Sequence, residues 1–171
     1  NSDLDFGTGD FCVMGWVKQD GSAIRSLLDR STPARTGALF ELRPNTGGAL
    51  VFYTQSSSGV ASYIISNTSA ISFGSWGFVA AVRRGGALEL WSNGRKLTVA
   101  TSVNSTLPRD VSNTNAVLSV GTRTDRELPF NGSLALLRIS GTAPTASQIS
   151  RIYNDEKVLF QENAQATLYG S

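Results

Sequence analysis

The chain has 171 residues, a length typical of one domain with a substantial core. Hydrophobic residues make up 40% and charged residues only 16%, and the formal net charge is +2, so no basic surface indicates a nucleic-acid partner. The sequence contains no histidine, which excludes Ser-His-Asp and Cys-His triads and ordinary catalytic zinc sites. No apolar run approaches the roughly 20 residues of a membrane-spanning helix, so we expect no membrane insertion.

Short runs rich in Val, Ile, Phe, Tyr and Trp alternate with Gly, Ser, Asn and Pro clusters along the chain. This spacing is typical of an all-β, antiparallel sandwich. The predicted strands are Phe11 to Lys18, Ala23 to Asp29, Ala38 to Arg43, Ala49 to Gln55, Ala61 to Ser66, Phe78 to Arg84, Ala87 to Ser92, Lys96 to Thr101, Ala116 to Gly121 and Gly132 to Ser140.

The single cysteine, Cys12, lies in the apolar run FCVMGWV, outside any metal-binding spacing. We therefore expect a buried, inert thiol.

The middle of the chain predicts a meander of three strands, because Gly85-Gly86 and Asn93-Gly94 are both two-residue hairpin signals. A turn centred on Asn93-Gly94 pairs Trp91 with Lys96. One face of the hairpin, predicted to face the core, then contains Leu88, Leu90, Leu97 and Val99. The opposite face contains Trp91, Glu89, Lys96 and Thr98, beside Ala80 and Val82 of the preceding strand.

One short helix is predicted near the end of the chain. Thr145 and Gln148 have the spacing of a capping box, and apolar residues follow at helical spacing up to about Asp155. We expect one sandwich domain over residues 1–157, followed by an extension over residues 158–171 that forms either an edge strand or a linker.

Three stretches together resemble the LamG-like family of concanavalin A-like lectin and glucanase domains. They are DLDFGTGDFCVMGWVK near the start, SWGFVAAVRRGGALELWSNGRKLTVA in the middle and FNGSLALLRISGTAPTASQISRIYND near the end. The resemblance covers roughly residues 3 to 155 and implies a jelly-roll of two antiparallel sheets with one short C-terminal helix.

The family usually begins with one further strand before the stretch that matches NSDLDFGTG. We expect either the C-terminal ATLYG or a neighbouring subunit to pair with the edge that this strand would occupy. The C-terminal VLFQENAQATLYGS also resembles segments of tailed-bacteriophage virion proteins.

Glycosidases on this fold carry paired carboxylates on one strand, typically Glu-x-Asp-x-x-Glu. That spacing does not occur in the chain, where the only acidic pairs at separation two are Asp3/Asp5 and Asp125/Glu127. We therefore predict no catalytic residues.

The loop TRTDRELPFNG concentrates charged residues. Asp125, Glu127 and Asn131 offer the oxygen donors that Ca²⁺ requires, as loop residues of the family often do, and Arg123 and Arg126 are candidate ligand-binding residues. The alternative is a solvated loop in which opposite charges offset one another, without a cofactor.

Trp91 is the remaining candidate for ligand binding. An indole ring beside Glu89, Lys96 and Thr98 has the chemistry to stack on a sugar and bond its hydroxyls. The alternative is that other parts of the chain cover this face, in which case Trp91 is a packing residue. Trp16 and Trp76 occupy positions at which the family places packing aromatics.

The combined expectation is a non-catalytic recognition module for carbohydrate binding or adhesion, within a larger extracellular or virion assembly. Its partner is a glycan or a protein, and it acts as part of a longer chain or as a homo-oligomer. A purely structural virion component with a protein partner is the second interpretation, and a glycoside-active enzyme is the third.

Overall fold

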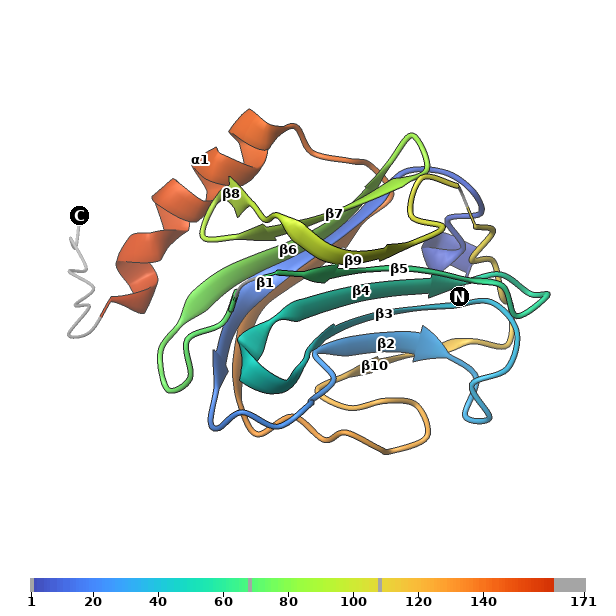
Figure 1. Ribbon diagram of the computed structural model, residues 1–171, viewed down its shortest axis with the longest axis horizontal. Coiled ribbons are helices and arrows are strands. Elements are labelled where there is room, and N and C mark those ends of the chain that lie inside the picture. The colour runs from blue at the N-terminus through green and yellow to red at the C-terminus, as the bar shows by residue number, and fades with distance from the viewer. Residues whose placement is uncertain (1, 68, 108, 162–171) are drawn as a thin grey trace, which may run out of the picture.

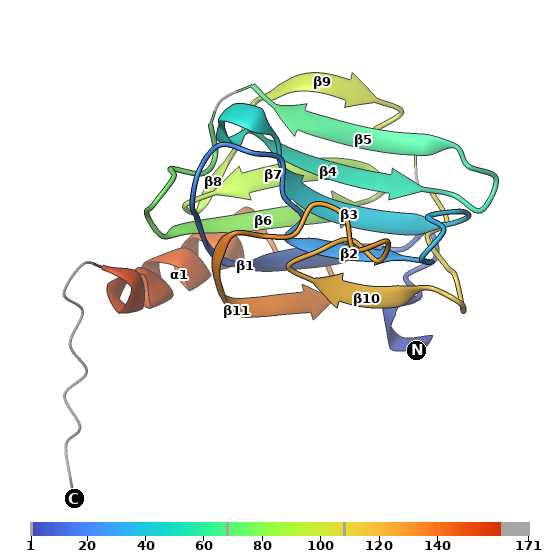
Figure 2. The same ribbon diagram turned by 90° about the horizontal axis from the view of Figure 1, so that it is seen from below.

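Two antiparallel β-sheets lie face to face in the computed structural model, which describes residues 2–67, 69–107 and 109–161 (Figure 1, Figure 2). The first sheet has the strand order β11-β1-β6-β7-β8 and consists of β1 (Phe11–Gln19), β6 (Gly77–Arg84), β7 (Ala87–Ser92), β8 (Arg95–Lys96) and β11 (Gly132–Ser140). The second has the order β10-β2-β3-β4-β5-β9 and consists of β2 (Leu28–Ser31), β3 (Leu39–Pro44), β4 (Leu50–Gln55), β5 (Ala61–Ser66), β9 (Val99–Val103) and β10 (Val117–Val120). The predicted antiparallel sandwich is confirmed.

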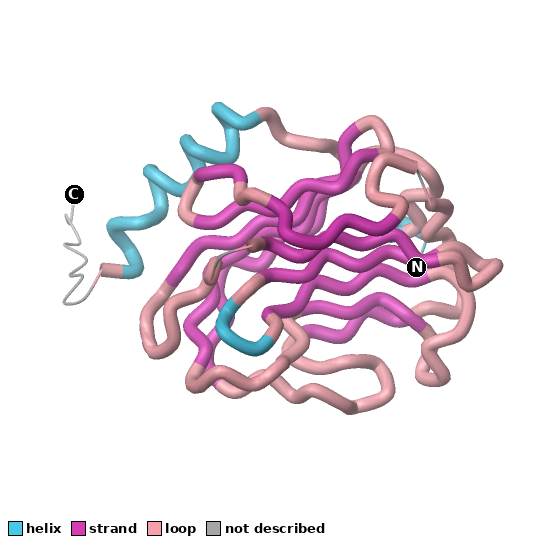
Figure 3. Tube along the Cα trace, in the orientation of Figure 1, coloured by secondary structure: helices cyan, strands magenta, loops and turns pink. Residues whose placement is uncertain are grey.

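The helix α1 (Ala146–Glu156) forms a third, partial layer against the five-stranded sheet (Figure 1). Its predicted capping box is confirmed, since the Thr145 hydroxyl accepts from the Gln148 amide and the Gln148 side chain accepts from the Thr145 amide. Three short 3-10 helices complete the described elements: η1 (Ser2–Leu4), η2 (Thr46–Gly48) and η3 (Lys157–Phe160). Loops join the strands mainly at the two ends of the sandwich (Figure 3).

Two hydrophobic clusters hold these layers together. The larger one lies between the sheets and includes Phe11, Phe40 and Phe52, all fully buried. The smaller one lies between the five-stranded sheet and α1 and includes Trp16 and Ile149. Strands β1 and β6 contact both clusters, which is why they are buried along nearly their whole length rather than at alternate residues.

Cys12 belongs to the smaller cluster and is fully buried, as predicted. Desolvation raises the pKa of its thiol to about 12, so the unreactive thiol form persists at neutral pH.

The predicted strand from Lys96 to Thr101 is wrong as a single element. The hairpin has the expected register, with Trp91 opposite Lys96, but pairing ends one residue later, where the Leu97 amide donates to the Leu90 carbonyl over 2.8 Å. The chain then crosses to the other sheet, where β9 pairs with β5 and Val99 lies opposite Ser66. Leu97 still packs on the main core, whereas Val99 is 36% exposed and does not face Leu88 as expected. The crossover gives β5 a partner along an edge that would otherwise expose its backbone.

The predicted strand from Ala23 to Asp29 also starts later than expected, at Leu28. The residues before it bond to neighbouring segments outside a regular ladder: the Ser26 amide donates to Leu128 and the Leu27 amide donates to Leu42.

Strands β10 and β11 form the edges of the two sheets on the same side of the molecule (Figure 2). Both carry exposed apolar residues, namely Val117, Leu118, Val120 and Leu136. The segment ATLYG, expected to pair with such an edge, lies outside the described residues. The first part of the predicted extension forms η3, where the Phe160 ring stacks on Trp16 at 4.2 Å between centroids.

Candidate functional site

Trp91 lies beneath α1 and is only 5% exposed. Its Nε1 donates a hydrogen bond to Glu89 Oε2 over 3.2 Å, and its ring packs in the cluster that contains Ile149. This burial does not support the predicted stacking role of Trp91 and favours the packing alternative. Trp16 is buried in the same cluster and Trp76 packs against it, as predicted.

The polar neighbours predicted beside Trp91 do gather around it. Lys96 Nζ lies 2.8 Å from Glu89 Oε1, and Arg84 lies 3.7 Å from the other carboxylate oxygen. Burial alone would raise the pKa of Glu89, but hydrogen bonds from Lys96 and Trp91 outweigh it and lower the pKa. Thr98 is exposed in the crossover and lies outside the paired part of the hairpin.

The predicted calcium ligands do not form an acidic cluster. Asp125 Oδ1 accepts from the Glu127 amide over 3.0 Å, and Asp125 Oδ2 lies 3.9 Å from Arg35 Nε. The Asn131 amide donates to the Asp20 carbonyl. Over the described ranges, no group of three or more Cys, Asp or Glu side chains is arranged to hold a metal ion.

The outer surface of the six-stranded sheet brings polar and aromatic side chains together. Strand alternation and register place one row of residues across all its strands: Ser119, Asp29, Glu41, Tyr53, Tyr63 and Val103. The Tyr53 and Tyr63 rings lie nearly parallel, at 17° and 5.8 Å between centroids, and both remain partly exposed. The Tyr53 hydroxyl donates to Gln55 Oε1 over 2.8 Å, which fixes the ring orientation. We call Arg43, Tyr53, Gln55, Tyr63 and Arg123 the tyrosine face.

A network of ion pairs supports one side of the tyrosine face. Arg123 donates to both oxygens of the buried Glu41 carboxylate, over 2.9 and 3.1 Å, and this pairing raises the pKa of Arg123. Arg35 joins the Glu41 and Asp29 carboxylates, at 3.1 and 2.6 Å. Asp29 also accepts from the Ser31 hydroxyl and the Thr124 amide. Both carboxylates are therefore engaged within the protein, where they orient the arginines.

Arg43 lies beside the Glu41 carboxylate without a hydrogen bond to it, and its Nε atom is buried. Its Nη1 donates to Asn45 over 3.3 Å, whereas its Nε has no hydrogen-bond partner among the described residues and lies 3.7 Å from Glu41. Burial lowers the pKa of Arg43, although a guanidinium stays charged at neutral pH. A depression of about 240 Å³ lies among Arg43, Tyr53, Gln55 and Arg123.

Of the predicted ligand-binding residues, Arg123 is the one that lies at this face, while Arg126 is exposed on the same loop, with a φ of 66°. Tyr53, Tyr63, Gln55 and Arg43 were not predicted. The signal was present: the predicted strands over 49–55 and 61–66 flank the turn-forming TQSSSG, and alternation puts one tyrosine of each strand on the same face. Arg43 joins them only through the pairing of β3 with β4.

The model of the concanavalin A-like lectin/glucanases superfamily matches residues 1–150, so the chain belongs to this superfamily. No curated protein sequence matches the chain. A carbohydrate-binding module of family CBM40 from the Ruminococcus gnavus IT-sialidase is similar in structure, with a TM-score of 0.71 and 14% identity over 86% of this chain and 84% of that one.

Two other solved structures are similar at 19% identity and a TM-score of 0.63. One is a native heptameric SAP-like pentraxin from Limulus polyphemus, matched over 84% of this chain and 69% of that one. The other is domain 4 of a GH43 extracellular arabinanase from Geobacillus stearothermophilus in complex with arabinotriose, matched over 88% of this chain and 69% of that one. These likenesses establish the fold. No helix among the described residues is long and apolar enough to cross a membrane.

Proposed function

We propose that the protein is a non-catalytic carbohydrate-binding module and that the tyrosine face is its sugar-binding surface. The observation that carries the proposal is the pair of partly exposed rings of Tyr53 and Tyr63 beside a depression lined by the Arg43 and Gln55 side chains. Sugars present apolar C–H faces and rings of hydroxyls, so they bind to aromatic surfaces flanked by hydrogen-bonding groups.

The structural relatives support this proposal. The CBM40 module also has a structure bound to α2,3-sialyllactose, and the arabinanase domain is in complex with arabinotriose. By analogy, the sugar packs against the tyrosine rings while Arg43 and Gln55 bond its hydroxyls. An open sheet face with one shallow depression implies weak binding per site, which several copies in one assembly strengthen.

The carboxylates at this face favour binding over catalysis. Glycoside hydrolysis needs one carboxyl group that gives a proton and another that reaches the sugar. Asp29 and Glu41 lie on neighbouring strands, but both are buried and held by arginines. Release of reducing sugar from a polysaccharide panel would instead support an enzyme.

The binding proposal is tested on a glycan array, with and without Ca²⁺, followed by titration of the best ligand. We expect Tyr63→Ala to weaken binding by about two- to tenfold, since stacking contacts contribute on the order of 0.5 to 1.5 kcal/mol. Phe73→Ala is the matched control, because Phe73 is 37% exposed and does not line the face. Equal affinity in the wild type and Tyr63→Ala would place the site elsewhere. Loss of binding in the absence of Ca²⁺ would support the hypothesis that the loop containing Asp125 and Glu127 binds calcium.

A structural module with a protein partner is the second candidate, favoured by the exposed apolar residues of β10. Uncharged edge strands pair readily with other strands. Solution mass measured over a range of concentrations tests this candidate: self-association that Val120→Lys abolishes supports it, and a monomer at high concentration counts against it. As part of the same proposal, the protein belongs to a larger extracellular or virion assembly, which includes the case of a bacteriophage.

A further inference from the structure

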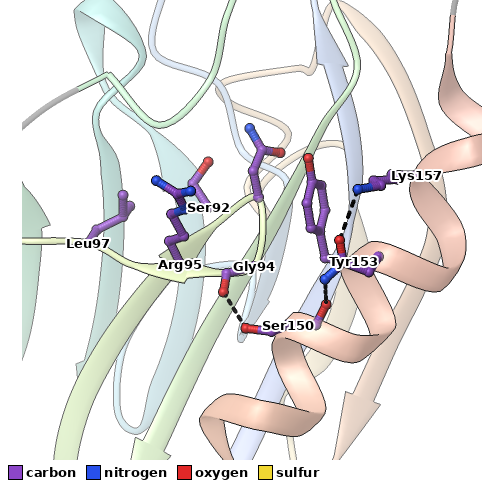
Figure 4. A pocket seen from close by; sticks show the side chains of 9 residues that line it. Ser92, Gly94, Arg95, Leu97, Ser150, Tyr153 and Lys157 are labelled. Atoms are coloured by element: carbon purple, nitrogen blue, oxygen red, sulfur yellow. Dashed lines mark hydrogen bonds between the residues drawn. The ribbon is translucent and has the colours of Figure 1, made fainter.

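A second hollow, separate from the tyrosine face, lies between the β7–β8 hairpin and α1 (Figure 4). We call it the hairpin–helix pocket, and its volume is about 620 Å³. It shares no lining residue with the depression at the tyrosine face, so a ligand in this pocket would be independent of sugar binding at that face.

The walls of this pocket are fixed by close packing. The Ser150 hydroxyl donates to the Gly94 carbonyl over 2.7 Å, which joins the hairpin tip to the helix (Figure 4). Gly94 lies so near the helix that a Cβ there would stand 3.0 Å from Tyr153 Cδ1. The pocket is therefore preformed, which lowers the entropic cost of binding a ligand.

Hydrogen-bond donors from both walls line this space. Arg95 comes from the hairpin and Tyr153 from the helix (Figure 4), and neither the Arg95 guanidinium nor the Tyr153 hydroxyl has a hydrogen-bond partner among the described residues. The Lys157 ammonium donates to Asn154 over 3.0 Å and lies 5.7 Å from the centre of the Tyr153 ring. Asn93 accepts from the Phe78 amide through Oδ1, and its side-chain NH₂ has no hydrogen-bond partner in the described ranges.

Within the part of the chain that the structure describes, no carboxylate lines this pocket, and the nearby ones are engaged elsewhere. Glu156 accepts from Trp16 and pairs with Arg138. Asp155 pairs with Arg151, 3.5 Å away on the exposed side of the helix. The pocket therefore presents two cations and two neutral donors without a compensating negative charge.

We propose that the hairpin–helix pocket binds the carboxylate of a small acidic sugar of the uronic acid class. Arg95 and Lys157 would hold the carboxylate, and Tyr153 and Asn93 would donate to neighbouring oxygens. A volume of about 620 Å³ accommodates a monosaccharide with its waters, within the range of small-molecule sites. Hydrogen bonds from charged donors to an ionised acceptor are stronger than those to a neutral acceptor.

The test compares galacturonate and glucuronate with galactose and glucose, which lack the carboxylate, in NMR titrations of the ¹⁵N-labelled protein. We expect the uronates to shift amide signals of the Asn93-Gly94-Arg95 turn and of α1, and the neutral sugars to bind at least about tenfold more weakly. Added salt should weaken uronate binding.

Arg95→Gln should raise the dissociation constant for the uronate about tenfold or more, the effect of losing one charge-assisted hydrogen bond. Arg151→Gln is the matched control, because it removes the same charge from a side chain that is 84% exposed and outside the pocket. Tyr153→Phe is a second variant that retains the ring packing on Trp16 and removes only the hydroxyl.

Retained uronate affinity in Arg151→Gln together with its loss in Arg95→Gln supports the proposal. Equal weakening in both variants would assign the effect to net charge and overturn it. So would failure of both uronates to bind, equal affinity for the neutral sugars, or amide shifts located at the tyrosine face.

Discussion

Trp91 and Tyr63 show that the role of a single residue depends on whether another layer of the structure packs over it. Both are aromatic, and both lie next to a polar residue on a β-strand. Trp91 is on the side of the five-stranded sheet that α1 covers, whereas Tyr63 is on the outer side of the six-stranded sheet and remains partly exposed. The strand pattern around each residue is similar, so the difference arises from the layer above it.

Trp91→Ala should therefore reduce stability and leave glycan binding intact. Truncating a large buried aromatic residue leaves a cavity, and we expect a loss of about 3 to 5 kcal/mol in the free energy of unfolding. Urea denaturation measures this loss, and Trp91→Phe should cost less because it keeps most of the ring. Unchanged stability with lost glycan binding would show that the ring contacts a ligand after all.

Asp5 gives the fold a specific sensitivity to acid. Its carboxylate accepts from the Asn113 amide over 2.8 Å and pairs with Arg30, which is 1% exposed. The Asn113 hydrogen bond, followed by the interactions with Arg30, lowers the pKa of Asp5 below its ordinary value of 3.8. This stabilisation is complete at pH values above 3.8 and is lost as the pH falls through the lowered pKa of the folded state.

Asp5→Asn should cost about 3 kcal/mol of unfolding free energy at pH 7, since it leaves a buried guanidinium without its counter-ion. The variant should also lose less stability than the wild type as the pH falls below 3.8, because it lacks the carboxyl group whose pKa is lowered by folding. Denaturation curves at several pH values measure both effects. Parallel pH profiles for the two proteins would contradict the assignment, and Asp3→Asn is a control at a neighbouring carboxylate.

At the scale of elements, the contact between the β7–β8 hairpin and α1 joins two segments far apart in the chain. Gly94 has a φ of +74° and packs directly on the helix. Gly85, in the turn before β7, has a φ of +54° but no atoms within 4 Å of a Cβ built at that position. Alanine at Gly85 therefore adds only backbone strain, whereas alanine at Gly94 adds backbone strain and a steric clash. Comparing the two substitutions separates these two costs.

Gly94→Ala should destabilise the protein more than Gly85→Ala. The shared cost of a left-handed backbone is about 1 kcal/mol, and the clash at Gly94 adds roughly 1 to 3 kcal/mol of overpacking. Thermal unfolding of both variants measures the difference. Equal losses would mean that the hairpin tip moves freely from the helix.

Short sequence patterns predicted most helices and strands correctly, because these elements depend on residues that are neighbours in the chain. The capping box at Thr145 and the turn at Asn93-Gly94 are satisfied by atoms within a few residues, and both appear as predicted. The prediction failed where the chain leaves the hairpin after Lys96, because alternation in the sequence does not show which sheet a strand joins. Pairing with β5 decides that, and β5 lies far earlier in the chain.

At the scale of the whole molecule, α1 and η3 cover the smaller hydrophobic cluster. Ile149, Tyr153 and Phe160 cover Trp16 and Phe78, with ring contacts of 4.2 to 6.2 Å between centroids. This layer explains why the five-stranded sheet has apolar residues on both of its faces.

Removal of residues 145–171 should expose that sheet face and produce a protein that binds hydrophobic dyes and aggregates. A chain ending at residue 161 retains these ring contacts, so it is the control and should unfold like the full chain. Dye fluorescence and solution mass measure the outcome. A stable, non-aggregating truncation at residue 144 would show that α1 is dispensable.

The sequence by itself determined the strand-rich class, most strand positions, the capped helix, the buried Cys12 and the register of the central hairpin. Each of these depends on periodicity or on atoms close together in the chain. Only the tertiary structure decided that α1 covers Trp91, that Tyr53 and Tyr63 share an open face with Arg43, and that Arg95 faces a pocket with Tyr153. The physical reason is that exposure depends on packing between distant segments, whereas alternation along a strand defines two faces without showing which one another layer will cover.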